Sequence, residues 1–135
     1  MMSENLEHLS NIARAVIQAE DFLEDTPDFP WSEFSIVFYS NDKGKLGGSF
    51  GYAYDASGDY EAFAISVRPI RQIIADYRDW LAKDTDKGFM QMLFQFNRDS
   101  GQVQADFEYD DPMRWKVTPN NIDDMIEELR PNLGE

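Results

Sequence analysis

Two segments late in the chain alternate between apolar and polar residues, and they constrain the fold more than any other feature. Their apolar members are Met90, Met92, Phe94 and Phe96 within residues 89–96, and Val103, Ala105, Phe107 and Tyr109 within residues 102–109. Because successive strand side chains point to opposite faces, this period of two predicts two strands, each with one apolar face. Residues 98–101, Arg-Asp-Ser-Gly, have the composition of a tight turn. The sequence therefore predicts an antiparallel hairpin whose apolar face must be covered.

Three segments upstream have the composition of further strands. Residues 33–39 are mainly β-branched or aromatic and too short for a helix, which predicts a strand buried on more than one side. Residues 46–54 alternate aromatic with small side chains, and residues 60–65 predict a third, shorter strand. Turn-forming residues separate these segments at 41–44 and 55–58.

Three other segments predict amphipathic helices, because their apolar residues recur at intervals of three and four. These segments are residues 4–24, 68–83 and 119–130. Pro27 and Pro30 follow the first segment and prevent the helix from continuing. The alternation of helices with strand pairs predicts an α+β fold in one domain spanning residues 1–135. We expect an antiparallel sheet of four to five strands in hairpins, with the N-terminal, central and C-terminal helices packed on one face.

The charge balance excludes several classes of partner. The chain has 12 Lys+Arg and 26 Asp+Glu, a formal net charge of −14, and this field repels nucleic-acid phosphates and anionic membrane surfaces. It attracts a basic protein and speeds association with it, although acidity also serves solubility alone. No apolar stretch reaches the length of a membrane span, and the first fifteen residues predict no secretory signal. With no cysteine present, we expect a soluble cytoplasmic protein without disulfides.

The inventory of catalytic groups is small. His8 is the single histidine, and near the start of a predicted helix a solvated surface residue is the simpler interpretation of it. No nucleophile motif, phosphate-binding glycine loop or EF-hand spacing is present. The abundant reactive groups are carboxylates, clustered as Asp55, Asp59 and Glu61 and as Asp106, Glu108, Asp110 and Asp111. Such clusters suit acid–base or metal chemistry, but a solvated face or a partner-binding surface explains them more simply. We therefore expect no enzymatic activity, no cofactor and no metal.

Residues 108–115 combine aromatic, acidic and basic side chains in the mixture found at interface hot spots. Tyr109 and Trp115 are candidate anchors for a protein partner. The same two rings could instead close one end of the core, with Arg114 paired to Asp110 or Asp111. Both interpretations stay open at the level of the sequence.

The chain resembles the YezG-like family of small bacterial immunity proteins, the antitoxins of polymorphic toxin systems. The resemblance covers most of residues 5–116. It lies first in the predicted N-terminal helix, in Trp31 leading into Phe34-Ser35-Ile36-Val37-Phe38-Tyr39, and in the strand around Phe50-Gly51-Tyr52. It continues in the helix carrying Arg78 and in the hairpin end Phe107-Glu108-Tyr109-Asp110-Asp111, which is followed by Arg114-Trp115. The chain departs from the family pattern from Lys116-Val117-Thr118-Pro119 onward, where a further helix is predicted.

The resemblance implies a protein without enzymatic activity that binds one toxin made in the same cell, often a nuclease, and blocks its basic substrate surface. It supplies no inhibitory residues, so the partner-binding residues are predicted from residue type alone. They are Asp55, Asp59, Glu61, Asp106, Glu108, Tyr109, Asp110, Asp111 and Trp115. The expected partner is a basic C-terminal toxin domain, and monomer and homodimer both stay open. The alternatives are an acidic secretion chaperone for a basic effector and a small carboxylate-dependent enzyme.

Overall fold

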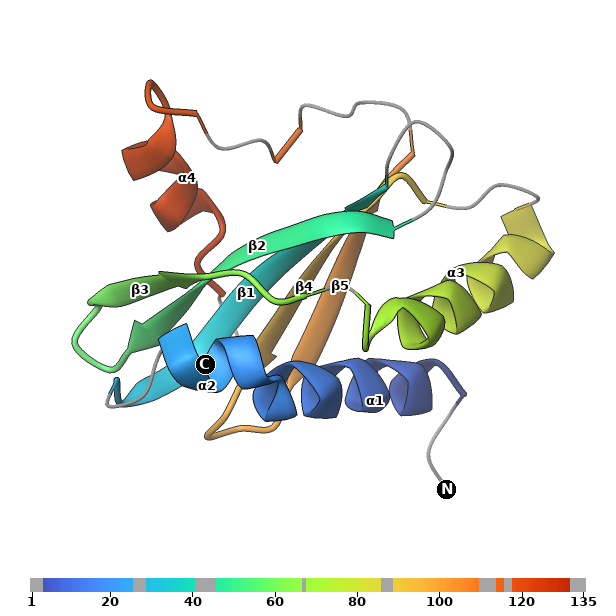
Figure 1. Cartoon of the computed structure of the whole chain (residues 1–135), viewed down its shortest axis with the longest axis horizontal. Coiled ribbons are helices and arrows are strands. Elements are labelled where there is room, and N and C mark those ends of the chain that lie inside the picture. The colour runs from blue at the N-terminus through green and yellow to red at the C-terminus, as the bar shows by residue number, and fades with distance from the viewer. Residues whose placement is uncertain are drawn as a thin grey trace.

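The fold is a five-stranded antiparallel sheet with helices on both faces (Figure 1). The computed structural model describes residues 4–25, 29–40, 46–66, 68–85, 89–109, 114–115 and 118–131. The strands are β1 (Trp31–Ser40), β2 (Leu46–Asp55), β3 (Tyr60–Phe63), β4 (Gln91–Asn97) and β5 (Val103–Glu108). The helices are α1 (Glu4–Gln18), α2 (Glu20–Asp25), α3 (Arg71–Thr85) and α4 (Ile122–Glu128). The predicted α+β class and antiparallel sheet are confirmed.

Strand β1 lies at the centre of the sheet, whose order is β3-β2-β1-β4-β5. Residues 34–38 are buried without interruption, because both faces of the central strand are covered. We call the side of the sheet that holds Phe34, Ile36 and Phe38 the first face, and the side that holds Ser35 and Val37 the second face. The prediction of a strand buried on more than one side is therefore confirmed.

Helices α1, α2 and α3 cover the first face (Figure 1). Helix α1 buries Leu9, Ile12 and Val16, whose spacing places them on one side of the helix. The predicted helix 4–24 is interrupted at Ala19, whose N–H bonds to the Val16 carbonyl three residues back. This tighter turn redirects the chain into α2.

Phe22 of α2 is 1% exposed and inserts between Trp31 and Phe63 in edge-on ring contacts. The change of direction at Ala19 thus allows Phe22 to be buried, because a continuous helix would direct this side chain elsewhere. Of the two prolines predicted to end the helix, Pro30 directly precedes β1, and Pro27 lies outside the described residues.

Helix α4 covers the second face, so the expectation that all helices pack on one face is wrong for the C-terminal helix. Its residues Met125 and Ile126, together with Leu129 and Trp115, pack on a layer formed by four residues of the sheet. These four are Val37, Tyr52, Tyr54 and Leu93. The side of the sheet opposite the first face is not simply polar: it carries two tyrosines and a leucine among its glutamines, and this apolar surface needs a cover of its own.

Hydrogen bonds from the sheet hold α4 in place. The Tyr54 hydroxyl donates to the Ile126 carbonyl at 2.6 Å, and the Gln95 amide nitrogen donates to the Leu129 carbonyl at 3.0 Å. The Arg130 guanidinium lies 4.5 Å from the centre of the Tyr54 ring and donates to the Gly58 carbonyl at 3.0 Å. Burial raises the pKa of Tyr54, so its hydroxyl stays protonated and keeps donating. A seven-residue helix without a side-chain cap depends on such tertiary contacts.

Replacing Tyr54 with Phe tests this attachment. Y54F leaves the buried Ile126 carbonyl without its donor, and we expect the free energy of unfolding to fall by about 1–2 kcal/mol. Urea denaturation measures the loss, and amide hydrogen exchange should accelerate within residues 122–128. Tyr60 is 47% exposed, so Y60F is the matched control and should change neither measurement. Equal effects of the two variants would contradict the assigned role of Tyr54.

Candidate protein-interaction surfaces

The turn between β2 and β3 is organised by one of the predicted site residues, Asp55. Its carboxylate oxygen Oδ1 accepts hydrogen bonds from the Ser57 N–H at 2.9 Å, the Ser57 hydroxyl at 3.0 Å and the Asp59 N–H at 2.9 Å. Partial desolvation favours a higher pKa, but these hydrogen bonds dominate and lower the pKa of Asp55. Gly58 adopts a φ of 95°, which a residue with a side chain rarely adopts. Asp55 therefore serves the turn, whereas Asp59 and Glu61 are exposed to a partner.

Helix α4 adds carboxylates beside this turn. Asp123, Asp124, Glu127 and Glu128 are all exposed. Arg130 joins the two elements, since it pairs with Glu127 at 2.9 Å and donates to the carbonyl of Gly58 in the turn. We call the exposed acids of the turn and of α4 the acidic corner: Asp59, Asp123, Asp124, Glu127 and Glu128. Glu61 lies opposite Ala53 and therefore belongs to the first face of the sheet, away from α4. The four acids of α4 were not among the predicted site residues, although their spacing of i, i+1, i+4 and i+5 already assigns them to one side of a helix.

Asp106 and Glu108 lie together on β5 but far from the acidic corner. Glu108 pairs with Arg114 at 3.3 Å and its side chain is 16% exposed, while Asp106 accepts a hydrogen bond from Gln104 at 3.2 Å. Strands β5 and β3 are the two outer strands of the sheet, about 19 Å apart at the usual strand spacing. Of the predicted acids that the structure describes, Asp55, Asp59 and Glu61 thus lie at one edge of the sheet, and Asp106 and Glu108 lie at the other.

Trp115 closes the core of the second face. It is 4% exposed, and the Arg114 guanidinium lies 4.5 Å from the centre of its ring. Tyr109 is half-buried and packs against the core of the first face. Of the two interpretations of these rings, the structure favours core closure for Trp115. Asp110 and Asp111 lie outside the described residues.

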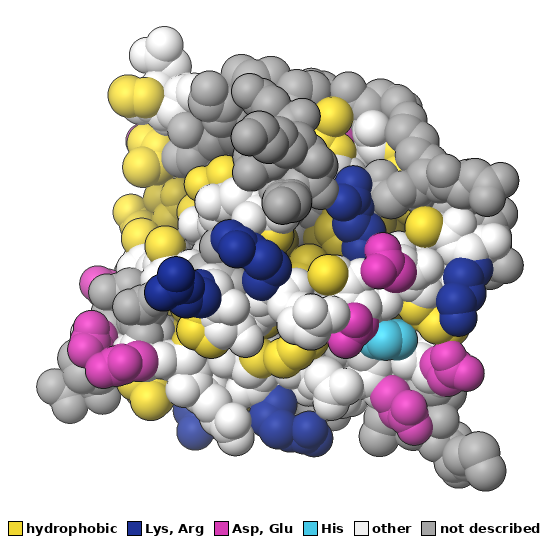
Figure 2. Space-filling view, turned by 45° about the vertical axis from the view of Figure 1, so that its right-hand side comes forward, with side chains coloured by type: hydrophobic (Ala, Val, Ile, Leu, Met, Phe, Trp, Pro, Cys, Tyr) yellow, Lys and Arg dark blue, Asp and Glu magenta, His cyan; other side chains and the backbone are white. Residues whose placement is uncertain are grey.

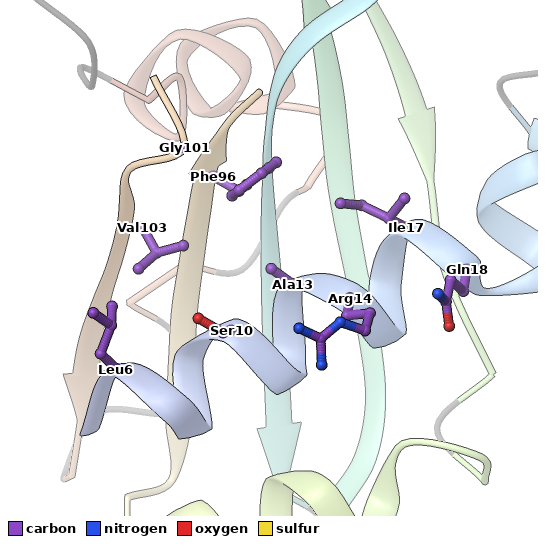
Figure 3. A pocket seen from close by; sticks show the side chains of 9 residues that line it. All are labelled: Leu6, Ser10, Ala13, Arg14, Ile17, Gln18, Phe96, Gly101 and Val103. Carbon is purple, nitrogen blue, oxygen red and sulfur yellow. The ribbon is translucent and has the colours of Figure 1, made fainter. Parts of the chain in front are cut away.

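A groove of about 270 Å³ runs between α1 and the β4–β5 hairpin (Figure 3). Its lining residues are Leu6, Ser10, Ala13, Arg14, Ile17, Gln18, Phe96, Gly101 and Val103. The lining is mainly apolar, and Leu6 remains 41% exposed. The groove forms where α1 crosses beneath β4 and β5, a relation between elements that no local sequence pattern could reveal.

His8 packs into an aromatic cluster, so it is only in part the solvated residue that we expected. Its ring stacks on Tyr77 with 5.2 Å between ring centres and lies 5.4 Å from Trp80. Tyr77 donates its hydroxyl to the Asn5 side chain at 2.7 Å and is 1% exposed. In Figure 2 the histidine reaches the surface next to acidic side chains. Its half-buried position is explained by packing between α1 and α3.

The described residues hold no group of three or more histidine or acidic side chains placed to bind a metal ion. No helix within these residues is long and apolar enough to cross a membrane. A scan against protein-family models finds no match for this chain, and none of the curated proteins compared with it is significantly similar. The resemblance to YezG-like proteins therefore depends on the residues quoted for it above.

The different roles of Asp55 and Asp59 can be tested by substitution with Ala. D55A removes three hydrogen bonds and should lower the free energy of unfolding at about pH 7, whereas D59A, the matched control, should leave it nearly unchanged. Since the pKa of Asp55 is lowered in the folded state, its stabilisation is present above the ordinary carboxyl pKa and is lost as the pH falls through the folded-state pKa. Urea denaturation at about pH 7 and about pH 3 should therefore give a smaller difference between wild type and D55A at the lower pH. A difference that grows on acidification would contradict this role.

Proposed function

We propose that this protein is an immunity protein that binds a cognate toxin and prevents the toxin from reaching its substrate. The observation that carries the proposal is the excess of surface carboxylates without basic partners. Against 26 acidic residues the chain has 12 basic ones, and two ion pairs join the side chains that the structure describes. Such an excess produces a strong negative field around the molecule and attracts a basic partner from a distance.

The two kinds of charge are unevenly distributed. Arg14, Arg68, Arg71, Arg78 and Lys83 belong to α1, α3 or the turn before α3. Figure 2 accordingly shows basic and acidic side chains mixed on the face that it presents. At the acidic corner, by contrast, Arg130 is already paired with Glu127, and Arg98, near the β2–β3 turn, lies with its guanidinium 4.7 Å from the centre of the Trp31 ring. The negative field is therefore expected to be strongest on the side of α4 and the β2–β3 turn.

Inhibition by this protein needs no chemistry from its own side chains. A toxin that acts on nucleic acid carries a basic substrate-binding surface, and an acidic protein of complementary shape can occupy that surface. The turn at Asp55 and the contacts of Arg130 fix the acidic corner before binding. The backbone that carries these carboxylates is thus ordered in the free protein, and less conformational entropy is lost when the complex forms.

The partner can be identified by co-expression. The tagged protein is produced in its own host together with the product of the gene immediately upstream, and bound material is identified by mass spectrometry. We expect recovery of the C-terminal domain of a large secreted protein, whose toxicity is lost in the complex. Recovery of no protein, or of small molecules alone, would overturn the proposal.

Association with the captured toxin should depend on charge. We expect the association rate constant to fall about ten-fold between about 20 mM and about 200 mM salt, because screening weakens electrostatic steering. The double variant D123K/D124K should slow association several-fold at low salt, with little change in the dissociation rate. The matched control E20K/E24K makes the same charge change at exposed positions of α2 and should have a smaller effect. Stopped-flow fluorescence measures both rates. An association rate constant that does not change with salt concentration would refute electrostatic steering.

A further inference from the structure

The outer edge of β5 carries backbone groups that no described residue pairs. The Asn97 N–H donates to the Gln102 carbonyl at 3.0 Å. This bond, together with the register of β4 and β5, shows which residues of β5 direct their backbone groups toward β4. Even-numbered residues of β5 therefore bond to β4, while Val103, Ala105 and Phe107 direct their N–H and C=O groups away from the sheet. The Arg114 side chain donates to the outward carbonyl of Phe107 at 3.3 Å, in agreement with this phase. Within the described part of the chain, the outward groups of Val103 and Ala105 have no hydrogen-bond partner.

The two sides of this edge differ in chemistry. On the first face, the apolar groove runs beside β5 and includes Leu6 and Val103, which Figure 3 shows next to each other. On the second face, β5 presents the side chains of Asp106 and Glu108. An extended chain lying along the edge would turn alternate side chains toward the two faces. The groove favours apolar side chains on one of them, and the carboxylates favour basic side chains on the other.

We propose that the outer edge of β5 is a docking site for an extended segment of a partner protein in which basic and apolar side chains alternate. The segment adds to the sheet as a sixth strand and bonds to the outward groups of Val103 and Ala105. This inference rests on the proposed function, because it specifies the element by which a basic partner is held.

A second copy of this chain is a poor occupant of the same edge. Antiparallel pairing of two β5 strands centred on Ala105 would bring the Asp106 and Glu108 carboxylates of both copies onto one surface. Each copy also carries a net charge of −14, which opposes association. The opposite edge of the sheet is less suitable, because β3 spans four residues. Beyond β3, the Ser49 hydroxyl already binds the N–H and carbonyl of Ile65.

Arg114 protects part of the edge in the free protein. It covers the Phe107 carbonyl and neutralises Glu108 with the same guanidinium nitrogen. A charged side chain over an open edge discourages unspecific strand pairing. A partner strand with a basic residue at this position would replace both of these interactions.

A synthetic peptide of alternating lysine and valine, about eight residues long and fluorescently labelled, probes the edge directly. Control peptides have the same composition in blocks, or the alternating sequence with every second backbone nitrogen methylated. We expect the alternating peptide to bind at least about ten-fold more tightly than either control, as measured by fluorescence anisotropy. Hydrogen exchange should slow at the amides of Val103 and Ala105 when it binds. Equal binding of the three peptides would overturn the proposal.

Two variants connect binding to this edge. A105P removes an outward N–H without removing a bond to β4, and it should weaken binding of the alternating peptide about ten-fold. D106K should weaken it comparably, whereas E20K makes the same charge change on α2 and should weaken it much less. Urea denaturation reports whether each variant is folded. If A105P fails to fold, the proposal is tested with D106K and with the methylated peptide. Unchanged binding of the alternating peptide to D106K would then refute the proposal.

Two further results separate this inference from the proposed function. If wild type and a folded A105P capture the same toxin with equal affinity, the immunity function stands and the edge is not its docking site. If the free protein is dimeric by size-exclusion mass and A105P makes it monomeric, the occupant is a second copy, which overturns the proposal. Weaker capture of the toxin by A105P, together with slowed exchange at Ala105 in the wild-type complex, is the expected outcome.

Discussion

Burial of β1 on both faces is the constraint on which the rest of this structure depends. Phe34, Ile36 and Phe38 need cover on one side, and Val37 needs it on the other, so no arrangement with helices on a single face could bury the central strand. Helices α1, α2 and α3 provide the first cover, and α4 with Trp115 provides the second. The requirement for a second cover also brings the carboxylates of α4 to the β2–β3 turn. The proposed steering surface is thus a consequence of how the core is closed.

The two covers are attached in different ways. The first depends on aromatic and aliphatic packing, as in the contacts of Phe22 with Trp31 and Phe63. The second buries fewer apolar side chains and adds hydrogen bonds from Tyr54 and Gln95 to carbonyls of the C-terminal segment. Polar residues on a sheet face usually indicate exposure to solvent. Here Tyr54 and Gln95 instead donate hydrogen bonds to the backbone of the segment that covers the face. Because hydrogen bonds are directional, they fix the position of α4 more closely than apolar packing alone would.

Local periodicity predicted much of this architecture. The alternation in residues 89–96 and 102–109 identified the β4–β5 hairpin, and helical spacing identified α1, α3 and α4. Periodicity shows which side chains share a face, but not which segment covers that face, so the side taken by α4 could not be derived. The glutamines of β4 make that side of its strand polar, whereas Tyr52, Tyr54 and Leu93 on the same face of the sheet require burial. The candidate surfaces were harder to predict, since the groove beside α1 and the contact of Arg130 with Gly58 join residues far apart in the chain.

Separation of the acids into two groups allows two physical effects to act at different stages of binding. In the proposed function, carboxylates of the acidic corner act through the solvent over about one Debye length, and they would affect how often the proposed basic partner arrives. They contribute little selectivity, since any basic surface is attracted. Hydrogen bonds at the β5 edge act only on contact, and they require an extended backbone with the correct alternation of side chains. Rapid capture and selective retention would therefore depend on different edges of the same sheet. Such a division would leave the β5 edge free to diverge with the proposed partner while the charge of the molecule stays constant.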